Sequence, residues 1–76
     1  MKIFGYEKKS EDDDAPIELS EVTLQANPKQ LKDVADFLIE AAQLIEKYGN
    51  DFGHEHYSHR SDVWAQGMPD IIAAKE

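Results

Sequence analysis

The chain has 76 residues, of which 41% are hydrophobic and 32% charged, so it can bury one modest core but not a deep substrate cavity. Sixteen acidic and eight basic residues give a net charge of −8, which argues against binding to nucleic acids or to anionic membranes. The absence of cysteine excludes disulfides and thiolate chemistry. Because no apolar stretch suits a signal peptide or a transmembrane helix, we expect one soluble, cytoplasmic domain over residues 1–76.

The first seventeen residues divide into a short strand and an acidic loop. Residues 2–7 contain isoleucine, phenylalanine and tyrosine, which favour a β-strand. Residues 8–17 carry the acidic run that includes Asp12, Asp13 and Asp14, and such a run is typical of a solvated loop. The run lacks the spacing of a calcium-binding EF-hand loop. An accessory role in attracting a basic partner is therefore the functional hypothesis for these three residues.

Alternation marks the next segment, residues 18–26. Val22, Leu24 and Ala26 fall on one side of an extended chain, with polar residues on the other side. A strand with one apolar and one polar face is typical of an antiparallel sheet.

A long amphipathic helix is predicted over residues 28–48. Asn27 is a good N-cap, Pro28 suits the first helical position and Gln30 can complete a capping box. Apolar residues then recur at steps of three and four, and Gly49 is a suitable terminator. The predicted apolar stripe consists of Leu31, Val34, Ala35, Leu38, Ala41, Ala42 and Ile45, widened by Phe37, Leu44 and Tyr48.

Two further strands are predicted after the helix, over residues 52–57 and 70–74. The fold class is therefore α+β, with one long amphipathic helix packed on a three- to four-stranded, mainly antiparallel sheet in the order β-β-α-β-β. If Ile71 and Ala73 face the helix, Ile72 and Ala74 point away from it. An apolar patch on that open sheet face could bind a partner or a second copy as a homodimer.

Three histidines form the cluster that most suggests chemistry. His54, Glu55, His56 and His59 lie within six residues, and His54 and His56 project to the same side of an extended chain. One hypothesis is a small metal-binding module or metal-dependent enzyme that uses His54, His56 and His59, since imidazoles bind Zn²⁺. No helical H-E-x-x-H motif supports it. The other hypothesis is a polar strand end whose side chains contact a partner.

The remaining chemical candidates are weaker. Ser58 and Ser61 lie near histidines, but no G-x-S-x-G elbow accompanies them, so we expect no enzyme activity and no cofactor. Trp64 is the one tryptophan, in a polar stretch near Arg60. It is either an exposed anchor for a partner, as Trp and Arg often are, or a cap on one end of the core.

Several short phrases are spread along nearly the whole chain. They are Met1-Lys2-Ile3, Gly5-Tyr6, Glu21-Val22-Thr23-Leu24, Pro28 and Leu31, Phe37-Leu38, Phe52-Gly53-His54-Glu55-His56, and Pro69-Asp70-Ile71-Ile72. Together they resemble a family of predicted immunity proteins from bacterial polymorphic-toxin systems, the type numbered thirty-two. The phrases 52–56 and 69–72 are the most distinctive. The resemblance implies a non-catalytic protein that binds and blocks a cognate toxin.

The expected function is thus inhibition of another protein, a basic toxin domain, by steric and electrostatic occlusion. The residues expected to contact this partner are His54, Glu55, His56 and Trp64, with Asp12, Asp13 and Asp14 as accessories. If Trp64 is an anchor, its replacement by alanine should weaken binding and leave the thermal midpoint nearly unchanged.

Overall fold

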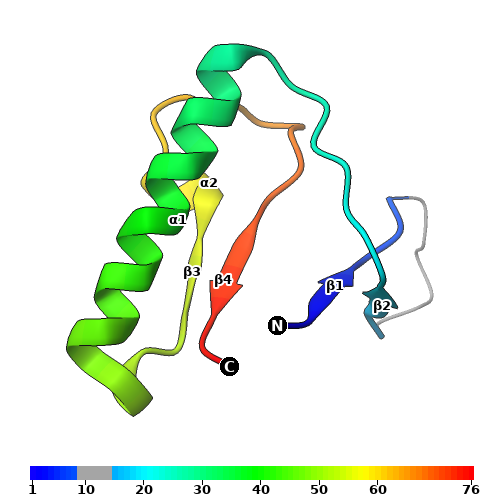
Figure 1. Cartoon of the computed structure of the whole chain (residues 1–76). Coiled ribbons are helices and arrows are strands. Elements are labelled where there is room, and N and C mark those ends of the chain that lie inside the picture. The colour runs from blue at the N-terminus through cyan, green and yellow to red at the C-terminus, as the bar shows by residue number, and fades with distance from the viewer. Residues whose placement is uncertain (9–14) are drawn as a thin grey trace.

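The computed structural model of the protein describes residues 1–8 and 15–76 (Figure 1). It confirms the α+β class and contains one long helix with four three-residue strands. In chain order the elements are β1 (Ile3–Gly5), β2 (Ile17–Leu19), α1 (Pro28–Tyr48), the 3₁₀ turn η1 (Gly49–Asp51), β3 (His54–His56), α2 (Tyr57–Arg60) and β4 (Ile72–Ala74).

Helix α1 begins and ends where the sequence predicts. The side chain of Asn27 accepts a 2.8 Å hydrogen bond from the backbone N–H of Gln30, and the Gln30 side chain accepts a 3.0 Å bond from the N–H of Asn27. This capping box satisfies two backbone donors. At the other end Gly49 has a φ of +55° and donates its N–H to the carbonyl of Ile45. No helix in the described part of the chain is long and apolar enough to cross a membrane.

The strands form two separate two-stranded sheets, so the prediction of one three- to four-stranded sheet is wrong. β1 pairs antiparallel with β2, and β3 pairs antiparallel with β4. Figure 1 shows the β1–β2 hairpin set apart from α1 and the β3–β4 ribbon. The order β-β-α-β-β is also interrupted, because the single turn α2 lies between β3 and β4.

The predicted strand over residues 18–26 is mostly wrong. Pairing with β1 ends at Leu19, and residues 21–27 are extended without a neighbouring strand. Val22 and Leu24 consequently remain 53% and 50% exposed. The pattern of alternation is present, but within residues 1–8 and 15–76 no second strand pairs with this segment to complete a ladder. Of the predicted acidic loop, residues 9–14 lie outside the described residues, and Ile17 belongs to β2.

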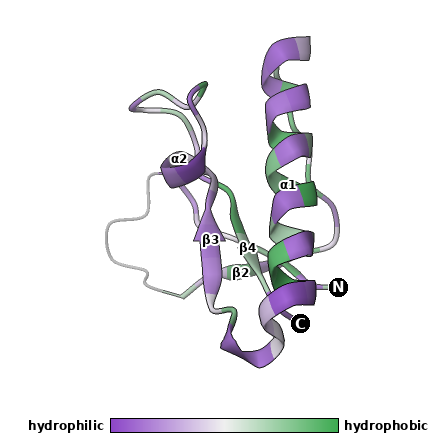
Figure 2. Ribbon diagram, turned by 90° about the vertical axis from the view of Figure 1, so that its left-hand side faces the viewer, coloured by the Kyte–Doolittle hydropathy of each residue, from purple (hydrophilic) through white to green (hydrophobic). Residues whose placement is uncertain are grey.

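The buried core is small and lies between α1 and the segment 57–73. Its buried side chains are Val34, Phe37, Ala41 and Tyr57, and its half-buried neighbours are Trp64, Ile71 and Ala73. Figure 2 shows the hydrophobic β4 beside the hydrophilic β3, with α1 across from them. The helix stripe is narrower than predicted, because its outer flank is not covered: Leu31 and Leu38 are 41% and 47% exposed.

Candidate partner-binding face

The β3–β4 ribbon has an inner face toward α1 and an outer face away from it. Residues that pair directly across two antiparallel strands point to the same face. Glu55 pairs with Ala73, which packs against the core, so Glu55 lies on the inner face. His54 pairs with Ala74 and His56 with Ile72. We define the outer face as His54, His56, Ile72 and Ala74. Because Ile71 and Ala73 pack against the core, Ile72 and Ala74 point away from the helix, as the sequence predicts.

His59 of α2 lies beside the outer face and continues the line of His54 and His56, and we call these three residues the histidine row. The ring centroids of His54 and His56 are 5.1 Å apart with the rings edge to face, and those of His56 and His59 are 4.8 Å apart and stacked. Within residues 1–8 and 15–76, no group of three or more His, Cys, Asp or Glu side chains could hold a metal ion. The metal-binding alternative therefore has no supporting arrangement in the described chain.

The carboxylate of Asp70 ties the histidine row to the loop before β4. It lies 2.8 Å from Nδ1 of His56, and it accepts hydrogen bonds from the N–H and hydroxyl of Ser58 at 2.8 and 2.9 Å and from the N–H of Ile71 at 2.9 Å. Burial acts to raise the pKa of Asp70, but these hydrogen bonds outweigh it and lower the pKa to about 2. Because the Ser58 hydroxyl donates to Asp70 and not to a histidine, the arrangement is not that of an activated nucleophile.

A second carboxylate, Asp33, joins α1 to α2. It accepts hydrogen bonds from the hydroxyls of Tyr57, at 2.5 Å, and of Ser61. The bond from Ser61 and then that from Tyr57 hold the pKa of Asp33 below its usual value. Burial, followed by the bond to Asp33, raises the pKa of Tyr57. Beside α2, Arg60 forms an ion pair with Glu40 of α1.

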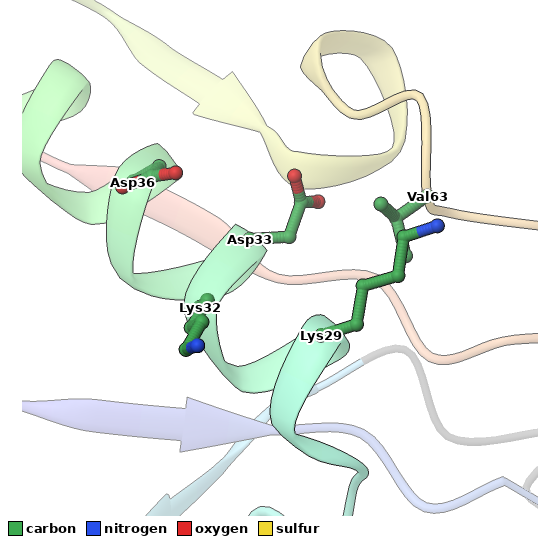
Figure 3. Close-up of a pocket in the computed structure, with 5 residues that line it drawn as sticks. All are labelled: Lys29, Lys32, Asp33, Asp36 and Val63. Carbon is green, nitrogen blue, oxygen red and sulfur yellow. The ribbon is translucent and has the colours of Figure 1, made fainter.

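The polar side of α1 also borders an open surface depression of about 380 Å³. Its lining residues are Lys29, Lys32, Asp33, Asp36 and Val63. Figure 3 shows the Asp33 side chain directed toward α2, with Lys29 reaching toward Val63. The depression is shallow and does not enclose a substrate. Its carboxylate Asp33 already accepts two hydrogen bonds from within the chain.

Trp64 lies at the edge of the core, on the other side of the ribbon from the histidines' face. Its ring is half-buried and packs against the core cluster of Val34, Phe37 and Tyr57. Its indole N–H donates a 3.0 Å hydrogen bond to the carbonyl of Pro69. Of the two readings of Trp64, the core cap is therefore the one with observed contacts.

The structure brings together only some of the residues predicted to contact a partner. His54 and His56 share the outer face with His59 beside them, whereas Glu55 and Trp64 lie on the core side. Asp12, Asp13 and Asp14 fall outside the described residues. Sequence reasoning missed two polar centres, Asp33 and Asp70. The single available signal was the position of Asp70 directly before the apolar residues 71–74.

The fold and this site define the class of the protein, a small α+β protein. The polar clusters that the structure describes form hydrogen bonds between its own helices, strands and loops. The particular family follows from comparison with known proteins. The family model of immunity protein 32 matches residues 21–76, and the chain belongs to this family. No curated protein matches the chain, and no solved structure does.

Proposed function

We propose that this protein binds a cognate bacterial toxin and neutralises it by occluding the toxin's active surface. The observation that carries the proposal is the match to the immunity protein 32 family over residues 21–76. An immunity protein acts through binding and needs no catalytic group. The hydrogen bonding of Ser58, Asp33 and Asp70 supports this proposal, because each is engaged within the fold.

The negative net charge of the protein supports a toxin that is basic. A net charge of −8 on 76 residues creates a negative field that speeds the approach of a positively charged protein and discourages other acidic ones. Asp12, Asp13 and Asp14 form the densest part of this charge in the sequence. In the proposal they act as an accessory attraction and not as the contact surface itself.

The outer face is the contact surface that we favour. It combines the imidazoles of His54 and His56 with the side chain of Ile72, which is 55% exposed. An exposed apolar centre beside polar rings is the composition of many protein interfaces. The His56 ring meets the His54 ring edge to face, stacks on the His59 ring and is held by Asp70, so little conformational freedom of His56 is lost when a partner binds.

The test has two stages. The tagged protein is used to capture partners from its source cells at low and moderate salt, and the captured proteins are identified by mass spectrometry. The chosen candidate is then expressed alone and together with this protein in a heterologous bacterium. We expect growth arrest by the candidate alone and recovery on co-expression. Capture of a protein whose toxicity is unchanged on co-expression would contradict neutralisation.

A further inference from the structure

The β1–β2 hairpin packs on no other helix or strand to any large extent within the described part of its own chain. Among the described elements, β1 and β2 contact each other far more than any other helix or strand, and Figure 1 shows them apart from α1. Phe4, Tyr6 and Ile17 are 54%, 67% and 51% exposed. The Met1 amino group pairs with Glu76, but both are more than four-fifths exposed, and such pairs contribute little. A two-stranded hairpin alone is marginally stable in water.

An apolar flank of α1 is also uncovered. Leu31, Ala35, Leu38 and Ala42 follow steps of four and three, so they lie on one side of the helix. Ile39 borders this flank and is 58% exposed, while Leu31 and Leu38 are 41% and 47% exposed. Glu40 and Asp33 lie on the opposite flank, where they contact α2. We call the uncovered side the apolar flank of α1.

The exposed area is larger than a compact monomer of this size needs. The chain exposes 6586 Å², whereas a compact monomer of 8.6 kDa exposes about 4,700 Å². Its Cα radius of gyration is 13.3 Å, against about 11 Å expected for 76 residues. The excess of roughly 1,900 Å² per chain exceeds the ~800 Å² that each partner buries in a standard interface. Over two chains it is about 3,800 Å², within the roughly 2,000–5,000 Å² of total area that obligate dimers bury.

We propose that a second copy of this chain covers both surfaces, with the β1–β2 hairpin of each protomer packed on the apolar flank of α1 of the other. One chain carries both complementary surfaces. In a two-fold symmetric dimer each hairpin covers the apolar flank of the other protomer, so that both copies of both surfaces are buried. The extended, unpaired segment 21–27 is the connection across which the hairpins exchange. If the protein is an inhibitor, as proposed above, it must persist without its toxin, and a dimer keeps these surfaces covered in that state.

Charge gives the dimer a salt dependence opposite to that of the toxin complex. Two copies carry a net charge of −16, twice the −8 of one, so they repel one another and added salt should strengthen the dimer. A complex with a basic toxin should weaken under the same change. The two proposals can therefore fail separately, because the dimer is measured in the absence of any toxin.

The first test is the mass of the purified protein by light scattering. A dimer has 17.2 kDa, twice the 8.6 kDa of one chain. We expect Leu38→Glu to give 8.6 kDa, because a charge in the apolar flank opposes burial. Gln43→Glu adds the same charge to an exposed polar position of α1 and should leave the dimer intact. A wild-type mass of 8.6 kDa at both low and high salt would overturn the proposal.

The second test asks which surfaces meet. The chain has no cysteine, so single cysteines report without background. Phe4 and Ile17 lie on opposite faces of the hairpin, because Phe4 pairs with Glu18 and Ile17 with Gly5. Phe4→Cys and Ile17→Cys are each mixed with Leu38→Cys and oxidised. A disulfide-linked heterodimer from either mixture supports the exchange; its absence from both overturns it, even if the protein is dimeric.

Discussion

The hydroxyl of Tyr57 donates a 2.5 Å hydrogen bond to the carboxylate of Asp33, and this contact joins α2 to the first half of α1. The ring that carries the hydroxyl is the most buried side chain described, 2% exposed, and its centroid lies 5.5 Å from that of Phe37. One residue thus fills the core and also fixes the distance between two helices. Ser61 donates to the same oxygen of Asp33. The Asp33 carboxylate therefore binds the first residue of α2 and the residue that directly follows its end.

The two functions of Tyr57 can be separated by substitution. Tyr57→Ala removes a buried ring and should lower the free energy of unfolding by about 3–5 kcal/mol, as for other buried aromatic residues. Tyr57→Phe keeps the ring and should cost much less, because Ser61 still donates to Asp33. Urea unfolding of the two variants checks the order. Equal losses would mean that the hydrogen bond, and not the ring, dominates.

Tyr57 should also confer a loss of stability in alkali. Its pKa is raised above the ordinary value of 10.0, first by burial and then by the bond to Asp33. The folded state therefore binds this proton more tightly than the unfolded state, and stability falls as the pH rises above about 10. Tyr57→Phe should show a shallower fall than the wild type. Tyr48→Phe, at a position 49% exposed, is the control and should follow the wild-type curve.

Acid should weaken the protein through Asp70. Its folded pKa of about 2 lies below the ordinary value of 3.8, so its stabilisation is present above about pH 4 and is lost as the pH falls from 4 to 2. The shift corresponds to at most about 2 kcal/mol, and nearer 1 kcal/mol because the side chain is 31% exposed. Asp70→Asn should therefore be less stable than the wild type at pH 7 and equally stable at pH 2. Asp62→Asn, an exposed carboxylate of the same loop, should show no such difference; a gap that persists for Asp70→Asn at pH 2 would point to packing.

Local signals in the sequence predicted the elements better than their assembly. Asn27, Gln30 and Gly49 fix the ends of α1 through bonds within four residues, and both ends were predicted correctly. In residues 71–74, which are apolar on both faces, the period of two along a strand predicted that Ile71 and Ala73 share one face and Ile72 and Ala74 the other, and the structure puts the first pair toward the core. Alternation in residues 18–26 predicted a strand that ends at Leu19, because a strand also requires a neighbour and none of the described strands pairs with the residues that follow.

The polar contacts of the site were not predictable for the same reason. Asp33 and Tyr57 are 24 residues apart, and Asp70 and Ser58 are 12 apart. No local pattern of residue types specifies such pairs. Glu55 illustrates the consequence: its place between two histidines suggested one site, but the pleat of β3 puts it on the other face.

Trp64 should behave as a core residue. Because its half-buried ring packs on the core and its N–H bonds to Pro69, Trp64→Ala should lower the free energy of unfolding by about 1–3 kcal/mol. The exposed-anchor hypothesis predicts the opposite, a nearly unchanged thermal midpoint. His54→Ala, at an exposed position of β3, is the matched control and should leave the midpoint within experimental error. An unchanged midpoint for Trp64→Ala would restore the exposed-anchor interpretation.

Loss of the helix cap should have a modest and defined cost. Asn27→Ala removes the acceptor of the Gln30 N–H, and comparable N-cap substitutions cost about 1 kcal/mol. Asn27→Ser retains a side-chain acceptor and should recover most of this loss. Thermal unfolding followed by circular dichroism at 222 nm compares the two. A loss for Asn27→Ser as large as that for Asn27→Ala would show that the capping bond contributes little.

Binding to the toxin should depend on the outer face and not on the helix. The double variant His54→Ala and Ile72→Ala removes a ring and an apolar centre from this face, at two positions that are both exposed, so the fold should be retained. We expect at least a tenfold loss of affinity for the captured toxin, about 1.4 kcal/mol, measured by calorimetry. Lys32→Ala and Gln43→Ala, together on the exposed side of α1, form the control and should bind as the wild type does. If the control loses affinity and the outer-face variant does not, the toxin binds the helix side, and the histidine row has no part in recognition.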